Sequence, residues 1–205
     1  MSGKYRTIVA DPPWPIKDSG PRTASSGGYW ERGQGTAGKR SVVPYERLSI
    51  AEIEALSIRD LAADDAHLYL WAVNAYLPEA YAVARAWGFR PSTLLTWCKK
   101  PMGLGLGGTF VNTTEFVLFA RKGTLPALSR VERTWWEWSR PYIHGGGPTH
   151  SAKPDAFLDV VEQASPAPRL ECFARRARFG WDYAGDGSLG TVELEGLRNP
   201  GEAAA

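Results

Sequence analysis

The sequence predicts a single α/β domain with a mainly parallel sheet. Its 205 residues give room for one sizeable core. Short apolar segments typical of buried strands alternate with segments whose apolar spacing fits helices, a pattern typical of α/β proteins. No internal repeat or linker interrupts the pattern. We therefore expect one domain over residues 1–186, followed by a C-terminal strand or tail over 187–205 that is partly flexible.

Each expected element has its own signals in the sequence. Asp11-Pro12-Pro13 ends the first strand sharply, and Ser49 with Glu52 forms a capping box at the first helix. Gly88 ends the second helix, and Pro154 lies in the first turn of the third. The expected strands cover residues 6–10, 67–73, 92–98, 114–120 and 169–173. The expected helices cover residues 49–58, 78–87 and 153–163, and the expected long loops cover 14–43 and the glycine-rich 99–112.

Composition excludes several classes of protein. No apolar stretch reaches the length of a membrane span, and no signal-peptide core follows Met1, so a cytoplasmic location, or a nuclear one in a eukaryote, is expected. The net charge of +2 is too small to argue for nucleic-acid binding by itself. Cys98 and Cys172 lie in strand-like apolar runs and are expected to be buried, reduced thiols. Two cysteines and three scattered histidines do not predict a metal site.

The sharpest motif is Asp11-Pro12-Pro13-Trp14, at the expected carboxyl end of a strand. Ligands bind at such ends in parallel sheets. An aromatic amine is a poor nucleophile because its lone pair is delocalised into the ring. Asp11 offers a carboxylate acceptor for the amine N–H groups, and Pro12 and Pro13 offer carbonyls in a stiff backbone. Trp14 offers a flat face for a base, and we expect it to be partly exposed. The alternative is a simple strand-ending turn.

These residues open an ordered set that resembles the MT-A70 family of adenine-N6 methyltransferases over nearly the whole chain. The set comprises Asp11-Pro12-Pro13-Trp14, Pro44-Tyr45 with Leu48-Ser49, Leu68-Tyr69-Leu70-Trp71, Trp87-Gly88-Phe89, the strand ending at Trp97, Asn112 with Glu115, His150-Ser151-Ala152-Lys153-Pro154, and Leu170-Glu171-Cys172-Phe173-Ala174-Arg175. The family includes the catalytic subunit of the eukaryotic messenger-RNA adenosine methyltransferase and many bacterial and phage members. The resemblance implies a Rossmann-like domain that uses S-adenosylmethionine, with the catalytic motif before the cofactor motif.

The resemblance also assigns roles to individual residues. The implied catalytic residues are Asp11, Pro12, Pro13 and Trp14. The implied cofactor-binding residues are Asp11, Tyr45, Lys153, Glu171, Arg175, Arg178 and Asp186, with Lys153 near the cofactor carboxylate. The implied substrate-binding residues are Trp14, Asn112 and Glu115. Plainer alternatives stand beside these roles: a core tyrosine for Tyr45, a solvated lysine for Lys153, surface or phosphate-contacting arginines for Arg175 and Arg178, a turn-stabilising Asn112, and ordinary surface charges for Glu115 and Glu171.

Two positions depart from the family pattern. Val111 stands where members often have an arginine, and Asp186 stands where an asparagine beside the ribose is common. The cluster of Trp135, Trp136 and Trp138 has no family role, and packing or an oligomer contact is expected for it rather than base stacking. His67 and His144 are expected to be structural.

The sequence therefore predicts methyl transfer to the N6 amino group of adenine in DNA. The first alternative is the same chemistry on RNA, and no motif separates the two nucleic acids. The second is a catalytically silent scaffold that binds nucleic acid beside an active partner. A homodimer or a heterodimer stays open, and no membrane partner is expected.

Overall fold

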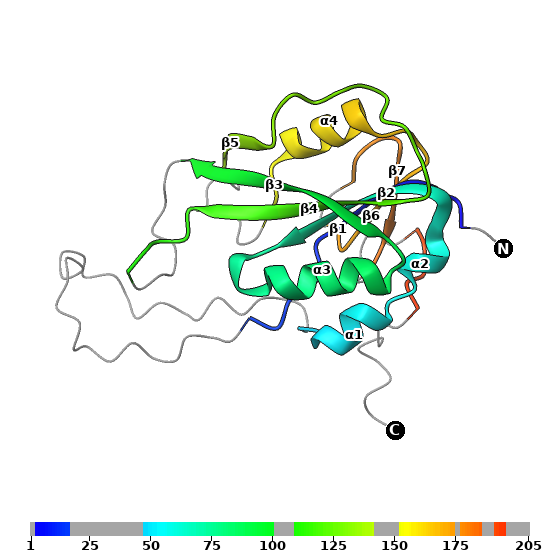
Figure 1. The fold of residues 1–205 in the computed structure, drawn as a ribbon, viewed down its shortest axis with the longest axis horizontal. Coiled ribbons are helices and arrows are strands. Elements are labelled where there is room, and N and C mark those ends of the chain that lie inside the picture. The colour runs from blue at the N-terminus through cyan, green and yellow to red at the C-terminus, as the bar shows by residue number, and fades with distance from the viewer. Residues whose placement is uncertain are drawn as a thin grey trace.

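The protein is described by a computed structural model over residues 3–16, 47–100, 109–141, 152–174, 177–185 and 191–195. The described strands form one seven-stranded sheet in the order β5-β3-β4-β2-β1-β6-β7 (Figure 1). All neighbouring pairs are parallel except those of β4, which is antiparallel to β2 and to β3. The strands are β1 Tyr5–Ala10, β2 Ala62–Ala72, β3 Arg90–Lys100, β4 Thr114–Lys122, β5 Trp135–Ser139, β6 Arg169–Cys172 and β7 Trp181–Ala184. The predicted mainly parallel α/β fold is confirmed.

Helices cover both faces of this sheet. The helices are α1 Ile50–Ala55, α2 Ile58–Leu61, the 3-10 turn η1 Asn74–Tyr76, α3 Leu77–Ala86 and α4 Asp155–Ala164. Helices α1 and α3 lie on one face and α4 on the other (Figure 1). Because side chains alternate along a strand, β1 sends Ile8 to the α1–α3 face and Val9 to the α4 face, where Val161 lies. The core therefore has two layers, one on each side of the sheet.

The helix boundaries follow the expected signals with small differences. Ser49 and Glu52 form the predicted capping box, but α1 ends at Ala55, and a separate short turn of helix, α2, follows. Gly88 follows α3 with a φ of +81°, a conformation in which glycine carries no penalty. Pro154 occupies the N-cap position of α4, one residue before its first turn, and makes no side-chain capping bond.

The two edge strands of the described sheet, β5 and β7, were not predicted. β5 contains tryptophans on both of its faces, so it lacks the apolar–polar alternation that marks a half-buried strand. β7 is only four residues long, too short for a periodic signal. β3 runs to Lys100, so that Lys99 and Lys100, which were assigned to a loop, are strand residues.

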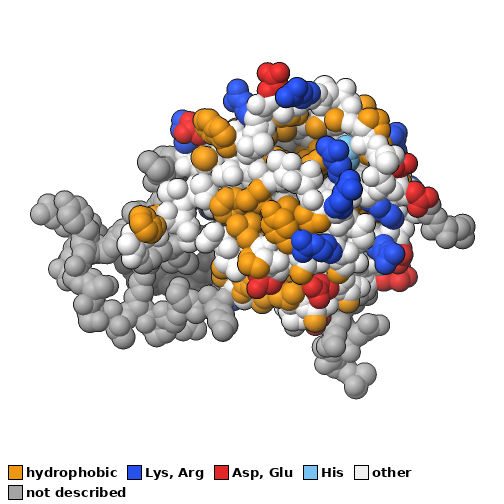
Figure 2. Space-filling view, in the orientation of Figure 1, with side chains coloured by type: hydrophobic (Ala, Val, Ile, Leu, Met, Phe, Trp, Pro, Cys, Tyr) orange, Lys and Arg blue, Asp and Glu red, His pale blue; other side chains and the backbone are white. Residues whose placement is uncertain are grey.

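The face of the molecule that carries α3 keeps some apolar surface (Figure 2). Hydrophobic side chains gather at the centre of this view, where β3 and β4 pass α3 in Figure 1, and Lys and Arg side chains lie beside them. Within the described residues, no helix is long and apolar enough to cross a membrane. Both cysteines are free; Cys172 is buried as expected, whereas Cys98 is partly exposed.

The sheet order fixes where a ligand site can form. β1 lies between β2, which follows it in the chain, and β6, which arrives much later. Such a reversal of strand order opens a crevice at the carboxyl ends of the two strands. Because β4 is antiparallel, its first residues reach the same edge of the sheet. Asp11, Thr114 and the segment before α4 therefore meet at one edge.

Candidate active site

Asp11 lies directly after β1, at the reversal point of the sheet. Its backbone N–H donates to the Cys172 carbonyl at 3.4 Å, which continues the pairing of β1 with β6. Pro12 and Pro13 are buried behind it. The Pro12 carbonyl accepts from the Trp14 N–H at 2.8 Å, and the Pro13 carbonyl accepts from the Leu48 N–H at 3.1 Å. The motif is thus a tight turn fixed by backbone hydrogen bonds, with Asp11 as its partly exposed acidic group.

Lys153 connects Asp11 to the antiparallel strand. Its Nζ lies 2.8 Å from Asp11 Oδ2 and 3.3 Å from Glu115 Oε2, and it sits over the Trp71 ring at 5.1 Å from the ring centre. The other oxygen of Glu115, Oε1, lies 2.6 Å from Lys99 Nζ. We call these four residues, Asp11, Lys99, Glu115 and Lys153, the site cluster. Their side chains are only 14% to 24% exposed.

The charges of the site cluster stabilise one another. Burial alone would lower the pKa of Lys153, but the carboxylates of Asp11 and Glu115 outweigh burial and raise it. Burial alone would raise the pKa of Glu115, but Lys153 and Lys99 outweigh burial and lower it. Lys153 and Glu115 are therefore both charged at neutral pH. The cluster alternates in sign and carries two positive and two negative groups.

Trp14 differs from its expected position. Its side chain is only 5% exposed, its indole N–H donates to the Trp71 carbonyl at 2.9 Å, and its ring stacks on Tyr76 with centres 5.8 Å apart. The expectation of a partly exposed Trp14 at the mouth of a cleft is therefore wrong. The residue packs in the core on the α1–α3 side and holds the Asp11–Pro13 turn in place.

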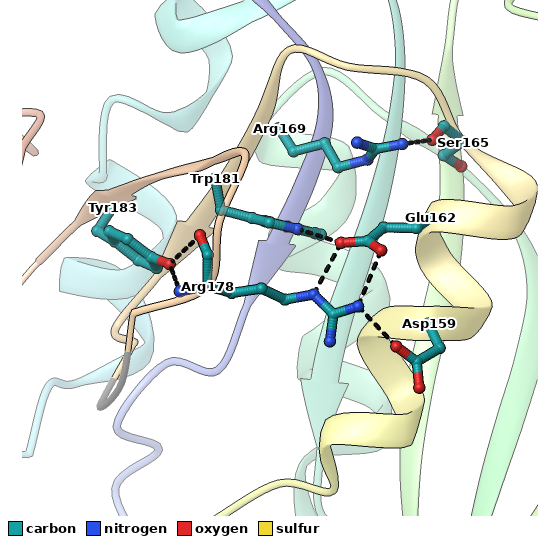
Figure 3. Close-up of polar contacts among 7 residues, drawn as sticks. All are labelled: Asp159, Glu162, Ser165, Arg169, Arg178, Trp181 and Tyr183. Carbon is teal, nitrogen blue, oxygen red and sulfur yellow. Dashed lines mark hydrogen bonds and ion pairs between the residues drawn. The ribbon is translucent and has the colours of Figure 1, made fainter.

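Arg178 is also placed differently from its implied role in cofactor binding. Its Nε donates to Glu162 Oε1 at 2.8 Å, and its Nη2 contacts Asp159 Oδ1 at 2.6 Å (Figure 3). The Trp181 indole N–H donates to the same Glu162 oxygen at 2.7 Å. We call Asp159, Glu162, Arg178 and Trp181 the clasp cluster. Trp181 pairs with Arg169, the first residue of β6. The clasp cluster therefore lies at the amino ends of these parallel strands, whereas Asp11 lies at the carboxyl end of β1.

The clasp cluster explains why Arg178 turns away from the crevice. The guanidinium bonds both oxygens of Glu162, a planar geometry that suits arginine, and these bonds raise its pKa. Tyr183 adds a hydrogen bond from its hydroxyl to the Arg178 carbonyl at 2.8 Å. The connection between β6 and β7 is thereby fastened to α4. These contacts give Arg178 a structural role, which differs from both alternatives, a solvated surface arginine and a phosphate contact.

The remaining implied residues fall into two groups. Glu171 is partly exposed on β6, paired in register with Val9 on the α4 face, and Asn112 is exposed just before β4. Both lie near the end of the sheet that carries Asp11. Glu171 is next to the last residue of β6, and Asn112 precedes β4, the strand that carries Glu115. The implied residues Tyr45, Arg175 and Asp186 lie outside the described part of the chain, as do His144 and His150. Val111, the departure from the family pattern, is 45% exposed.

Phe173 marks the end of β6 by an unusual backbone. It has a φ of +67°, the left-handed region that a bulky residue rarely adopts, and its N–H donates to the Ala184 carbonyl at 2.7 Å. Gly185, with a φ of +109°, lies against it, and a Cβ there would meet Phe173 N at 3.1 Å. Strained backbone of this kind clusters at ligand sites. It lies next to Asp11, across the reversal point.

Sequence reasoning missed one charged member of the site. Lys99 had been assigned to a loop, yet it is a strand residue whose neighbour on the same face, Trp97, lies under its ammonium group at 5.5 Å. The sequence did contain one signal for Lys99. If the strand continues past Trp97, alternation places Lys99, two residues later, on the same face as Trp97. His67, by contrast, is structural as expected: it is buried, and its ring contacts Ser165 Oγ at 2.7 Å and the Leu125 carbonyl at 3.0 Å.

Comparison with known proteins identifies the family and relatives of this chain. The family model for MT-A70 matches residues 5–187. The chain is 30% identical over 190 residues to the Type II methyltransferase M.MunI of Mycoplasma sp, an alignment that covers 89% of this chain and 77% of that protein. It is 27% identical over 207 residues to a probable N(6)-adenosine-methyltransferase MT-A70-like protein of Oryza sativa subsp. japonica, covering 96% of this chain but 25% of the rice protein. The chain therefore belongs to the MT-A70 family of methyltransferases.

Proposed function

We propose that the protein transfers a methyl group from S-adenosylmethionine to the N6 amino group of adenine in DNA. The observation that carries this proposal is the Asp11 carboxylate, fixed at the reversal point of the sheet by the 2.8 Å ion pair with Lys153. An acceptor held at this point can bind an amine N–H with little reorganisation. Preorganised polar groups of this kind are usually the largest contribution to catalysis.

The donor groups at the crevice fit the proposed cofactor. S-adenosylmethionine carries a sulfonium and an ammonium cation together with ribose hydroxyls, and carboxylates suit all three. Asp11 follows β1, and Glu171 lies on the adjacent strand β6 on the α4 face. Lys153 offers a cation to the cofactor carboxylate. When bound, S-adenosylmethionine supplies an activated methyl group on sulfur.

The residues of the chain would act on the adenine by positioning it. Asp11 accepts a hydrogen bond from one N–H of the amine, which favours a pyramidal nitrogen whose lone pair points at the methyl group. The Pro12 carbonyl has a second lone pair beside the one used by Trp14 N, and it can accept from the other N–H. The amine loses its proton after it has been methylated and carries positive charge. This chemistry needs no covalent intermediate on the protein.

Lys153 and Glu115 keep Asp11 in its working state. Lys153 is held between the two carboxylates, so it cannot rotate away from Asp11 without leaving Glu115. The raised pKa of Lys153 keeps the cation present through neutral pH. The resemblance implies that Glu115 binds the substrate. Here Glu115 is linked to Asp11 by Lys153, which contacts both carboxylates.

The choice of DNA over RNA is supported by the relatives. The name of the Mycoplasma protein is that of a Type II methyltransferase, and this chain covers most of its length. The name of the rice protein, N(6)-adenosine-methyltransferase, favours RNA as a second candidate, but this chain covers only a quarter of that protein. The ion-paired Asp11 and Lys153 argue against a silent scaffold, since such a protein has no need for an acceptor held in place at the crevice.

The test offers both nucleic acids to the same preparation. The protein is incubated with methyl-labelled S-adenosylmethionine and with DNA or RNA of matched sequence, and the digested nucleosides are separated by mass spectrometry. We expect label in N6-methyldeoxyadenosine, and cofactor binding by calorimetry at about micromolar strength, roughly −8 kcal/mol. Label only in N6-methyladenosine would select the RNA candidate. Label in neither, with no heat from the cofactor, would reject both.

A further inference from the structure

The tryptophan-rich strand β5 presents a stacked aromatic pair on the α4 face of the sheet. Trp136 and Trp138 lie with ring centres 5.3 Å apart and planes within 12° of each other. Both are half-buried, and the Trp138 carbonyl accepts from the Trp97 indole N–H at 2.9 Å. Trp135 points to the opposite face and is 56% exposed. The pair is therefore anchored by its neighbours while part of its aromatic surface stays open.

This pair adjoins the site cluster. β5 pairs in parallel with β3, and Trp138 is the register partner of Lys99. Lys99 contacts Glu115, which contacts Lys153, which contacts Asp11. In the strand order, β5 and β6 lie on opposite sides of β1, the strand that Asp11 follows. The proposed cofactor residue Glu171 is on β6, so β5 lies on the other side of Asp11 from it.

Arg140 supplies a cation at the end of the same strand. Its backbone N–H donates to the Lys100 carbonyl at 3.2 Å, which continues the β3–β5 pairing by one residue. Alternation therefore places Arg140 on the same face as Trp136 and Trp138. Its Nε is buried and has no hydrogen-bond partner within the part of the chain described here. A buried guanidinium N–H without an acceptor is costly, and a phosphate oxygen is a suitable acceptor.

We propose that Trp136, Trp138 and Arg140 form a subsite for a nucleotide next to the target adenine, with its base against the indole rings and its phosphate on Arg140. The inference rests on the proposed function in that it takes the substrate to be a nucleic-acid strand. Aromatic surface with an adjacent cation is the usual combination for binding unpaired nucleotides. A base displaced from a duplex leaves unpaired neighbours that such a subsite can hold.

The test measures binding of a short single-stranded DNA with one central adenine by fluorescence anisotropy. Trp136→Ala should weaken binding by about five- to a hundredfold, and Trp136→Phe should retain most of it. Trp135→Ala is the matched control, because it removes the same residue type from the other face of the same strand. Equal binding by Trp136→Ala and Trp135→Ala would overturn the proposal.

A second probe separates a direct contact from a change in folding. Replacing the neighbours of the adenine by abasic sites should weaken binding to the wild-type protein, but it should cost Trp136→Ala little more. If the abasic probe costs both proteins equally, the rings do not contact the neighbouring base and the proposal fails. Arg140→Gln should reduce the salt dependence of binding by about 0.7 in log–log slope, the value for one phosphate of a single strand, whereas Arg133→Gln on the exposed segment before β5 should change it less.

These outcomes are distinguishable from failure of the proposed function. A wild-type protein that methylates adenine while Trp136→Ala behaves like Trp135→Ala would reject only the subsite. A wild-type protein that binds the strand through Trp136 but methylates no adenine would reject only the proposed reaction.

Discussion

Two ion-pair clusters adjoin α4, one just before its first residue and one along its middle and last turn, and in each a cation lies between two carboxylates. In the site cluster, Lys153 lies between Asp11 and Glu115, and the three side chains are 14% to 24% exposed. In the clasp cluster, Arg178 lies between Asp159 and Glu162, which are 67% and 30% exposed. The two carboxylates of the clasp cluster belong to one helix, whereas those of the site cluster come from the ends of β1 and β4.

This difference indicates a structural role for the clasp cluster and a role in chemistry for the site cluster. The planar guanidinium of Arg178 bonds both oxygens of Glu162. It fixes a chain connection at small desolvation cost because its carboxylate partners are 67% and 30% exposed. The site cluster removes four charges from water, and buried ion pairs give little net stability compared with apolar packing. A fold that needed only stability would gain more from apolar side chains there. The buried cluster is consistent with a role for Asp11 in chemistry.

The largest effect on folding should come from Trp14, beside the site cluster. Trp14→Ala removes a buried ring and its hydrogen bond to Trp71, and it should cost roughly 3–5 kcal/mol in the free energy of unfolding. Urea denaturation measures this loss. Trp14→Phe keeps a ring to pack against Tyr76 and should lose less. A stable Trp14→Ala protein with weakened DNA binding would restore the base-stacking role instead.

A smaller effect is expected when the clasp cluster is broken. Arg178→Ala should cost about 1–2 kcal/mol of unfolding free energy, since its bonds are partly exposed and water screens them. The affinity for S-adenosylmethionine, measured by calorimetry below the unfolding transition, should stay close to that of the wild-type protein. Unchanged stability with at least about tenfold weaker cofactor binding would return Arg178 to the role that the family resemblance implied.

The smallest effect concerns pH and the second lysine of the site cluster. Lys99 helps to lower the pKa of Glu115, so Lys99→Met should raise that pKa. A carboxylate with a lowered pKa keeps its charge until the pH falls through that value. The acid limb of kcat/KM should therefore move to higher pH in Lys99→Met, with little change at roughly pH 7 to 8. Lys100→Met, which affects the exposed pair with Glu137, is the control. An acid limb that stays in place would separate Glu115 from activity.

The fold was predictable where local signals agree with the tertiary structure. The Ser49–Glu52 capping box and Gly88 mark helix ends by local chemistry, and the apolar runs of β1 and β2 are long enough to be recognised. β5 was missed because Trp135 and Trp136 occupy opposite faces, which hides the period of two. The edge position of this strand, set by pairing with β3, is a long-range contact that no local pattern encodes.

The site was predictable in its residue types but not in all of its partners. The structure brings together Asp11, Glu115 and Lys153, which the resemblance names one by one, from segments far apart in the sequence. The position of Trp14 was predicted wrongly because the local sequence, a tryptophan after two prolines, is the same whether the ring packs inward or faces a ligand. In the fold, the hydrogen bond to the Trp71 carbonyl and the stacking on Tyr76 hold the ring in the core. Arg178 was misplaced because its partners lie on α4, 16 and 19 residues earlier.

The rate of methyl transfer in Asp11→Asn tests the central claim most directly. Asparagine keeps the size of the side chain but removes the charge that Lys153 holds in place. With saturating S-adenosylmethionine and a DNA substrate in a single turnover, at a temperature where circular dichroism shows both proteins folded, we expect a rate at least about a hundredfold below that of the wild-type protein. Transfer to adenine within a few-fold of the wild-type rate would contradict the account, because Asp11 would then not be the group that orients the amine.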